Sequence, residues 1–173
     1  MQTRHIVFCE GHQAVTNPWF GELPFQLAKG EILSGATTGD LPTQILNYGH
    51  WLIPLADGHF KTGATFDTQN LNTLPSQAAA NQLIDALYKV LPAVRTANIR
   101  AQQAGIRPTT LDKQPFIGRH PYHAKLHIFN GFGAKGSLCI PWYARQMSLA
   151  LLQQQPLPPV VDVKRYYATH FPA

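Results

Sequence analysis

AQQAGIRPTTLDKQPFIGRHP, residues 101–121, is the stretch on which the fold of this chain depends. It places an arginine before a proline, follows them with two threonines and an aspartate, and ends in a short apolar run that stops at Gly118. Pro108 disfavours helical backbone at the residue before it, so Arg107 is expected on an extended segment. A surface loop has no need of this pattern, whereas a site that holds an anion does.

The side chain of Arg107 needs a partner, because a guanidinium among isoleucine, proline and threonine is costly to bury alone. A carboxylate is its natural partner, bound through two parallel N–H···O bonds. One candidate is Asp112, in an ion pair that would pin the turn. The other is the carboxylate of a bound substrate. The sequence leaves both open.

Short strands and two helices are predicted on either side of this stretch. Strands are expected in residues 4–11, from residue 25 with an interruption at Gly30, in a hairpin of residues 45–55 and 59–66, and in residues 95–104, 115–118 and 125–132. Helices are expected from Thr73–Ser76 to Pro92 and over residues 135–155. This order predicts an α+β fold, with a mixed, largely antiparallel sheet, packed helices and a C-terminal helix.

Composition narrows the class of protein. The 173 residues suffice for one domain with a core, or for one domain and part of another. Charged residues make up only 13% of the chain, which suggests that a cofactor, a partner or another piece of chain covers part of the surface. The formal net charge of +5 is spread without a basic run. This argues against a nucleic-acid surface and suits an anionic ligand.

The cysteines and histidines give no sign of a metal site. Cys9 and Cys139 lie far apart in apolar runs, and we expect buried, reduced thiols in a cytoplasmic protein. There is no C-x-x-C pair, and His120 and His123 have no obvious third ligand, so no metal is expected. No segment has the length of a membrane span or the pattern of a signal peptide.

A glycine-rich loop follows the last predicted strand. Gly131-Phe132-Gly133-Ala134-Lys135-Gly136 spells G-x-G-x-x-G before a helix. A dinucleotide-binding unit would continue with another strand and an acidic residue, but this helix runs into glutamines and prolines. Glycines still let the backbone approach a flat or anionic ligand, and Gly136, Ser137 and Leu138 would offer amides at the helix start. The alternative is a glycine turn without a ligand.

Two aromatic residues flank the predicted hairpin. Trp51 lies where the first strand leaves its turn, and Phe66 lies at the end of the second strand. Aromatic residues on strands usually belong to the core, and that is the simplest interpretation of each alone. Together with Arg107 they would wall a small pocket.

Three segments in this order resemble the second half of the FAD-dependent D-amino-acid oxidase/glycine oxidase family. They are WLIPLADGHFKTGATF, AGIRPTTLDKQPFIGRHP and NGFGAKGSLCIPWYARQMSLALL. The resemblance spans residues 25–155 and implies three parts. These are a piece of the FAD domain in 1–24, a substrate-binding sheet domain with one helix in 25–104, and a flavin-facing part of the FAD domain in 105–173.

The resemblance also implies roles for individual residues. Arg107 would bind the substrate carboxylate, Trp51 would stand in place of a tyrosine that orients the substrate, and Phe66 would line the pocket. Contacts to FAD would come from the remaining matched positions, which are Gly11, Gly131, Gly133, Ala134, Lys135, Gly136 and Ser137. The implied chemistry removes a hydride from the carbon that bears the amine and passes it to FAD, with no protein base required.

The sequence departs from the family in three places. Trp51 has no phenolic hydroxyl, and Ala134 stands where some relatives carry a longer polar side chain. Residues 1–24 contain no glycine-rich turn for the ADP half of FAD. The chain is therefore expected to lack the N-terminal nucleotide-binding half, to bind FAD weakly alone, and to expose an apolar face where that half docks. A partner chain or self-association would cover this face.

Three functions remain as hypotheses. The first is the substrate-binding, flavin-facing part of an FAD-dependent oxidoreductase of amino acids or related amines. The second is a non-catalytic α+β domain that binds a small carboxylate or another protein. The third is the flavin domain of a tRNA-modifying enzyme, which the basic pI of about 9.4 favours.

Overall fold

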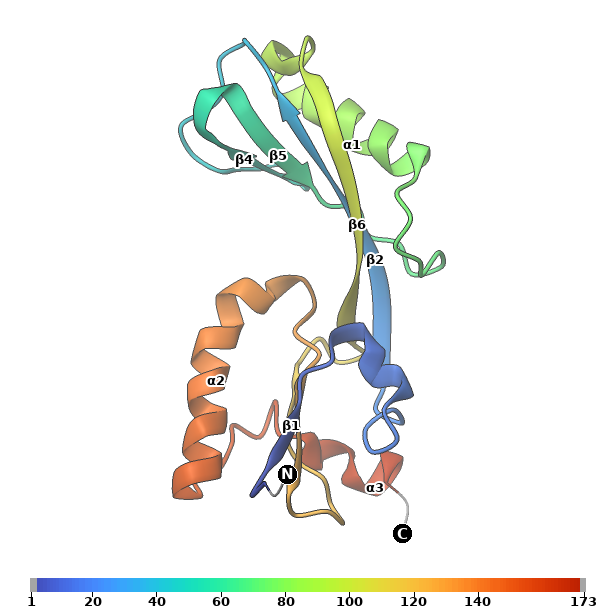
Figure 1. The fold of residues 1–173 in the computed structure, drawn as a ribbon, viewed down its shortest axis with the longest axis vertical. Helices are drawn as coiled ribbons and strands as arrows, with labels where there is room; N and C mark the ends of the chain where they lie inside the picture. Colours follow the sequence, from blue (N-terminus) through green and yellow to red (C-terminus); the bar gives the residue numbers. More distant parts are fainter. Residues whose placement is uncertain (1–2, 172–173) are drawn as a thin grey trace. The chain divides into compact units, whose positions relative to one another are not determined.

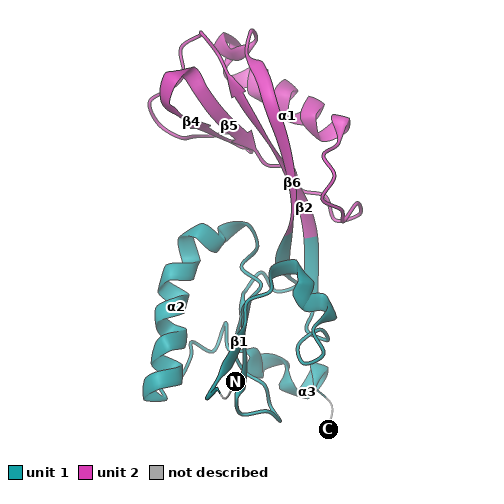
Figure 2. Cartoon of the chain, in the orientation of Figure 1, with its two compact units in different colours: residues 1–27, 107–173 teal, residues 28–106 magenta. Residues whose placement is uncertain are grey.

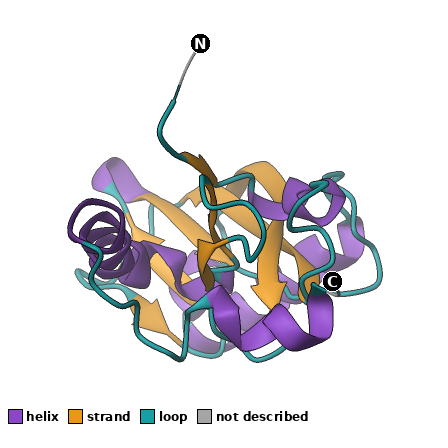
Figure 3. Ribbon diagram, turned by 90° about the horizontal axis from the view of Figure 1, so that it is seen from below, coloured by secondary structure: helices purple, strands orange, loops and turns teal. Residues whose placement is uncertain are grey.

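The computed structural model describes residues 3–171 and divides the chain into two compact units (Figures 1 and 2). Unit 1 is formed by the chain up to residue 27 and from residue 107 onward, and unit 2 by residues 28–106. The chain passes from one unit to the other twice, in strands β2 (Phe25–Ala36) and β6 (Asn98–Thr110). The chain combines strands and helices (Figure 3), and each unit contains both, so the predicted α+β class is confirmed.

Unit 1 holds a three-stranded sheet with the order β1-β8-β7. Its strands are β1 (Ile6–Phe8), β7 (Phe116–Arg119) and β8 (Leu126–Asn130). β1 runs parallel to β8, with Val7 opposite His127, and β7 runs antiparallel to β8, with Gly118 opposite Ile128. β8 therefore lies in the centre of this sheet, and β1 at its edge.

Two helices belong to unit 1. The longer one, α2 (Gly136–Gln153), packs its buried Met147 against Ile117 of β7 and against Val161. The short helix α3 (Tyr167–His170) follows a 3₁₀ turn, and beside it Phe171 joins a core with Phe116, Ile128 and other residues.

Unit 2 is a five-stranded sheet with the order β3-β4-β5-β2-β6, and one helix packs against it. The remaining strands are β3 (Leu46–Asn47), β4 (Trp51–Pro54) and β5 (His59–Gly63). The helix α1 (Gln77–Val90) begins at its N-cap Ser76, whose hydroxyl accepts a hydrogen bond from the amide of Ala79. The fully buried Leu83 and Leu87 of α1 pack in clusters with residues of the sheet.

The predicted hairpin is confirmed in β4 and β5, which are antiparallel with Leu52 opposite Thr62. Its turn places Asp57 at φ 56° and Gly58 at φ 71°. A Cβ at Gly58 would lie 2.3 Å from the carbonyl oxygen of Thr37, so the turn needs glycine for its backbone angle and for space. The two helices predicted before Pro92 and over residues 135–155 are also confirmed, as α1 and α2.

Three predictions about the strands were wrong. β2 runs without a break through Gly30, because one glycine weakens a strand but does not end it when both neighbours pair. The strand predicted over 45–55 is two short strands, β3 and β4, because the chain folds back at residues 48–50 and places Leu46 opposite Leu52. The strand predicted over 95–104 instead begins at Asn98 and continues through Arg107 to Thr110, because Pro108 fits extended backbone.

Burial also differs from expectation. Cys9 is exposed and Cys139 only partly covered, so neither is the buried thiol that was predicted. Ile6 of β1 is 43% exposed, because β1 lies at the edge of its sheet. The apolar sequence of this strand had predicted that it is buried. The segment after the prolines is not a loose tail, since Val161 and Val163 are completely buried. No helix in residues 3–171 combines the length and the apolar character needed to cross a bilayer.

Candidate cofactor site

The glycine loop connects β8 to α2 and adopts backbone angles that favour glycine. Gly131 has φ 82° and Gly133 has φ 55°. The loop passes so close to the end of β6 that a side chain at Gly131 would collide with it and one at Gly133 would be in tight contact with it. A Cβ at Gly131 would lie 2.6 Å from Cγ2 of Thr110, and one at Gly133 would lie 3.2 Å from Cγ2 of Thr109. The loop therefore rests directly on the two threonines that follow Arg107 and Pro108.

Thr110 is the least satisfied polar group in this region. Its side chain is 1% exposed, and its hydroxyl oxygen has no hydrogen-bond partner in the described part of the chain. An unpaired buried hydroxyl costs about 1–3 kcal/mol. Its neighbour Thr109 donates a short hydrogen bond to the carbonyl of Gln26 and is satisfied.

The structure brings Gly11 to the same loop. The buried Asn130 at the end of β8 donates from its amide to the carbonyl of Gly11, at 2.9 Å, and accepts from the amide of Gly131 at 2.8 Å. Gly11 has φ 62°, and a Cβ there would meet nothing within 4 Å. Two of the predicted cofactor-binding glycines thus lie beside each other at the ends of the parallel strands β1 and β8.

The start of α2 supplies the remaining predicted residues. A short 3₁₀ turn over Gly133–Lys135 leads into the helix, and the N-cap Lys135 makes no side-chain capping bond. The first turn has no acidic side chain, and Ser137 and Leu138 are exposed. The helix start thus keeps its partial positive charge without an internal anion, which is the arrangement that attracts an anionic group.

Arg107 is half-buried on β6, three residues before Thr110, in the same unit as the glycine loop. Burial lowers the pKa of its guanidinium. The alternative interpretation gave Asp112 as its partner. In the structure, Asp112 accepts instead from Arg165 at 2.8 Å and from the amide of Gln114 at 3.0 Å. The turn after β6 is therefore pinned by Arg165.

Trp51 and Phe66 lie in the other unit. Trp51 pairs with Gly63 across β4 and β5, and a Cβ at Gly63 would lie 3.1 Å from its indole ring. Phe66 follows β5 and keeps 60% of its surface exposed. The sequence did not point to Asn130 or Thr110 as site residues. Their positions in the sequence could have indicated them: Asn130 directly precedes the first glycine of the loop, and Thr110 ends the Arg-Pro-Thr-Thr segment.

Comparison with known proteins agrees on one family. The sequence model of the DAO family, described as FAD dependent oxidoreductase, matches residues 2–149. Among curated proteins, a glycine oxidase of Pseudomonas putida is 31% identical over 121 residues, covering 69% of this chain and 33% of that protein. The tRNA 5-methylaminomethyl-2-thiouridine biosynthesis bifunctional protein MnmC of Leptospira interrogans is 24% identical over 196 residues, covering 93% of this chain and 30% of that protein.

Solved structures share the fold. L-proline dehydrogenase from P. horikoshii aligns with a TM-score of 0.83 at 16% identity, covering 99% of this chain and 49% of that one. The chain thus spans about a third of the length of the curated relatives described above, 33% and 30%, and about half of this structural neighbour.

Proposed function

The chain belongs to the DAO family of FAD-dependent oxidoreductases, and we propose that it is the substrate-binding and flavin-facing part of an oxidoreductase that acts on amino acids or related amines. The observation that carries this proposal is the approach of the glycine loop to the end of β6. An added Cβ would collide with Thr110 at Gly131 and would be in tight contact with Thr109 at Gly133, and Asn130 links Gly11 to this loop.

The residues present fit the isoalloxazine part of FAD. Glycines at 131 and 133 let backbone atoms approach a flat ring, and the start of α2 favours negative charge next to it. The unpaired hydroxyl of Thr110 behind the loop is a further polar group in this region. When bound, FAD accepts the hydride that leaves the carbon bearing the amine.

This chain's own residues would bind and orient the substrate. Arg107, half-buried on β6 three residues before Thr110, is proposed to hold the carboxylate in a bidentate pair. Trp51 and Phe66 are proposed to line the pocket around the amine-bearing carbon, with Trp51 acting through shape because an indole lacks the phenolic hydroxyl. Gly11, Ala134, Lys135, Gly136 and Ser137 are proposed to contact the flavin.

A nucleotide-binding half, from a partner chain or another segment, is proposed to complete the enzyme. The exposed side of α2 carries Leu138, Trp142 and Leu152, which are 82%, 51% and 83% exposed. β1 is an edge strand within the part of the sheet that the structure describes. Both features suit a docked domain, because exposed apolar stripes and sheet edges normally have partners.

A titration of FAD against the purified chain tests the cofactor site. We expect weak quenching of flavin fluorescence by the chain alone. We also expect Gly131→Ala to weaken it further, because the new methyl group collides with Thr110. Gly49→Ala is the matched control, since Gly49 also has positive φ, 90°, but has nothing within 4 Å of an added Cβ. Equal effects of both substitutions, or no interaction with FAD, would contradict the proposal.

A second titration tests Arg107. Binding of a small amino acid such as glycine, in the presence of FAD, is expected to disappear in Arg107→Ala while the unfolding midpoint changes little. Global unfolding of that variant would assign Arg107 a structural role instead.

The match to MnmC supports a second candidate function, action on an amine that is part of a tRNA. That match covers 93% of this chain, and the sequence pI is about 9.4. Under this hypothesis the amine substrate is part of a tRNA. The chain would then bind tRNA with an affinity that falls steeply as salt rises. Binding that is absent at low salt excludes it.

A further inference from the structure

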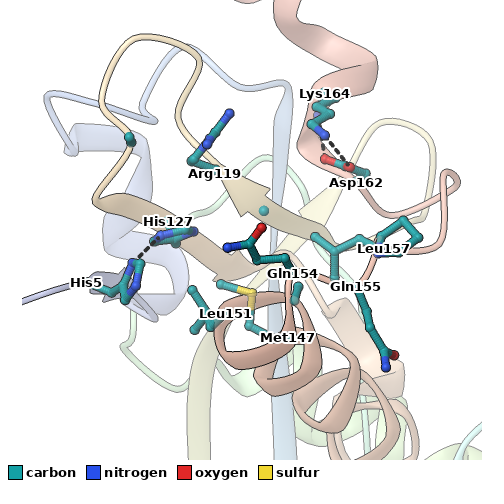
Figure 4. Close-up of a pocket in the computed structure, with 14 residues that line it drawn as sticks. His5, Arg119, His127, Met147, Leu151, Gln154, Gln155, Leu157, Asp162 and Lys164 are labelled. Carbon is teal, nitrogen blue, oxygen red and sulfur yellow. Dashed lines mark hydrogen bonds and ion pairs between the residues drawn. The ribbon is translucent and has the colours of Figure 1, made fainter.

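A pocket of about 550 Å³ lies in unit 1 at the end of α2 that is remote from the glycine loop (Figure 4). Gln154, which lines it, is separated from Gly136 by the whole helix, about 27 Å at 1.5 Å per residue. The pocket has the volume of a small-molecule site. It includes neither Arg107 nor the loop glycines, so it is distinct from the site proposed above.

One wall of the pocket is rich in nitrogen donors. His127 of β8 is 7% exposed, and its Nε2 lies 3.0 Å from Nδ1 of His5. Arg119 of β7 lines the same wall, because Arg119 pairs with His127 across the two strands. Figure 4 shows His5 and His127 in contact on one side and Met147 and Leu151 of α2 below them.

Positively charged side chains outnumber acidic ones in the lining of the pocket. Burial, and then the charges of His5 and Arg119, lower the pKa of His127 to about 4. Within residues 3–171, Arg119 makes no ion pair with the carboxylates of Glu31, Asp112 or Asp162, which pair with Lys29, Arg165 and Lys164. The one acid of the pocket, Asp162, lies 3.8 Å from the Nζ of Lys164, which also lines it. The lining therefore keeps a cationic excess, carried by the exposed side chains of Arg119 and Lys164 beside the buried His127, which favours an anion.

Gln154 adds an independent sign of a site. It caps α2 with φ 55°, a left-handed angle at which helices usually place glycine. A non-glycine residue there costs about 1 kcal/mol, and such strain is found most often at functional positions. Figure 4 shows its side chain in the middle of the pocket, between the histidines and Leu157.

We propose that this pocket binds a small oxyanion, a phosphate or carboxylate group, held by Arg119 and the His5–His127 pair, with the amide of Gln154 beside it. Met147 and Leu151 form an apolar floor for the body of the ligand. The anion would compensate the charge of Arg119 and would favour the protonated form of His127.

Histidine-ring NMR of the complete chain, titrated separately with inorganic phosphate and with succinate, tests the proposal. We expect a saturable shift of the His127 signals and a rise in the pKa of His127 with at least one of the two anions. The anion that binds more tightly identifies the class of the ligand. Arg119→Gln should weaken binding about tenfold or more, as expected for a charged hydrogen bond. The matched control is Arg145→Gln, an exposed arginine of α2 outside the pocket, and it should change the affinity less than about twofold.

Gln154→Gly provides a second test, in which stability and anion affinity should change in opposite directions. It should raise the urea midpoint, because glycine relieves the left-handed strain, and it should weaken anion binding. The proposal is overturned if neither anion shifts His127 saturably, or if Arg119→Gln and Arg145→Gln behave alike. Neither result bears on the flavin site, because no residue of that site is changed.

Discussion

Replacing Lys29 by methionine should destabilise unit 2 more than most single substitutions. Lys29 and Glu31 lie on β2 with side chains only 4% and 3% exposed, and their Nζ and Oε1 atoms are 3.2 Å apart. The ammonium also donates to the Oδ1 of Asn72, at 3.0 Å, and to the carbonyl of Leu74. Lys29 thus ties the strand to the segment that leads into α1.

Glu31 is held equally tightly from the other side. Its carboxylate accepts from the amide and the hydroxyl of Ser76, both at 2.8 Å, and from the amide of Gln102 at 2.7 Å. Burial by itself would raise the pKa of Glu31, but the hydrogen bonds from Ser76, Lys29 and Gln102 outweigh it, and the pKa is lowered. Removing Lys29 leaves this buried carboxylate without its cation.

The magnitude follows from that loss. Removing one partner of a buried ion pair costs about 3–5 kcal/mol. With a urea m-value of about 2 kcal/mol per molar, the unfolding midpoint of Lys29→Met should fall by about 1.5–2.5 M. Lys61→Met, an exposed lysine on β5, is the control and should change stability by less than about 0.5 kcal/mol.

The double variant Lys29→Met with Glu31→Leu distinguishes the cost of leaving Glu31 charged and unpaired from the cost of losing the ion pair. It should recover part of the loss, because an apolar pair needs no desolvated charge. The measurement is urea unfolding followed by circular dichroism. If Lys29→Met unfolds at the same urea concentration as Lys61→Met, the reasoning about the buried pair is wrong.

Glu31 also predicts a pH dependence. Because its pKa is lower in the folded chain, its contribution is complete above the unfolded pKa and is lost as the pH falls through the folded pKa. The urea midpoint should therefore fall more steeply with acid in the wild type than in Glu31→Gln.

Three further predictions concern unit 1. Thr110→Val should leave stability unchanged or raise it by up to about 1 kcal/mol in urea unfolding, because the hydroxyl it removes is unpaired; a clear loss would mean that the hydroxyl has a partner. Arg165→Lys should cost about 1.5–3 kcal/mol in the same assay, since lysine cannot bond Asp112 and two carbonyls while lying over the ring of Phe116; an unchanged midpoint would contradict this. His127, with its pKa lowered to about 4, should stay neutral at pH 5 in a histidine-ring NMR titration, and its contribution to stability should be lost as the pH falls from its ordinary pKa of about 6.5 toward 4.

Local rules predicted most of the secondary structure. The Asp-Gly turn, the helix that begins at Ser76 and the helix after the glycine loop depend on nearby residues, and each was predicted from them. The failures depend on distant contacts. Whether Gly30 breaks a strand depends on the pairing of β2 with Asp67 and β5 on one side and with β6 on the other. Whether Cys9 is buried depends on what covers the end of β1. The pattern of apolar residues along the chain carries no information about either of these distant contacts.

The partner of Arg107 shows why pairing is harder to predict than position. The extended backbone at Arg107 followed from Pro108, but Asp112 was offered as a partner because it is near in sequence. In the structure, Asp112 pairs with Arg165, which lies 53 residues after it in a segment that the sequence pattern predicted to be a short tail. That segment packs Val161 and Val163 into the core, and this packing aims Arg165 at the turn after β6. The carboxylate-binding role of Arg107 is a separate proposal, which the Arg107→Ala titration tests.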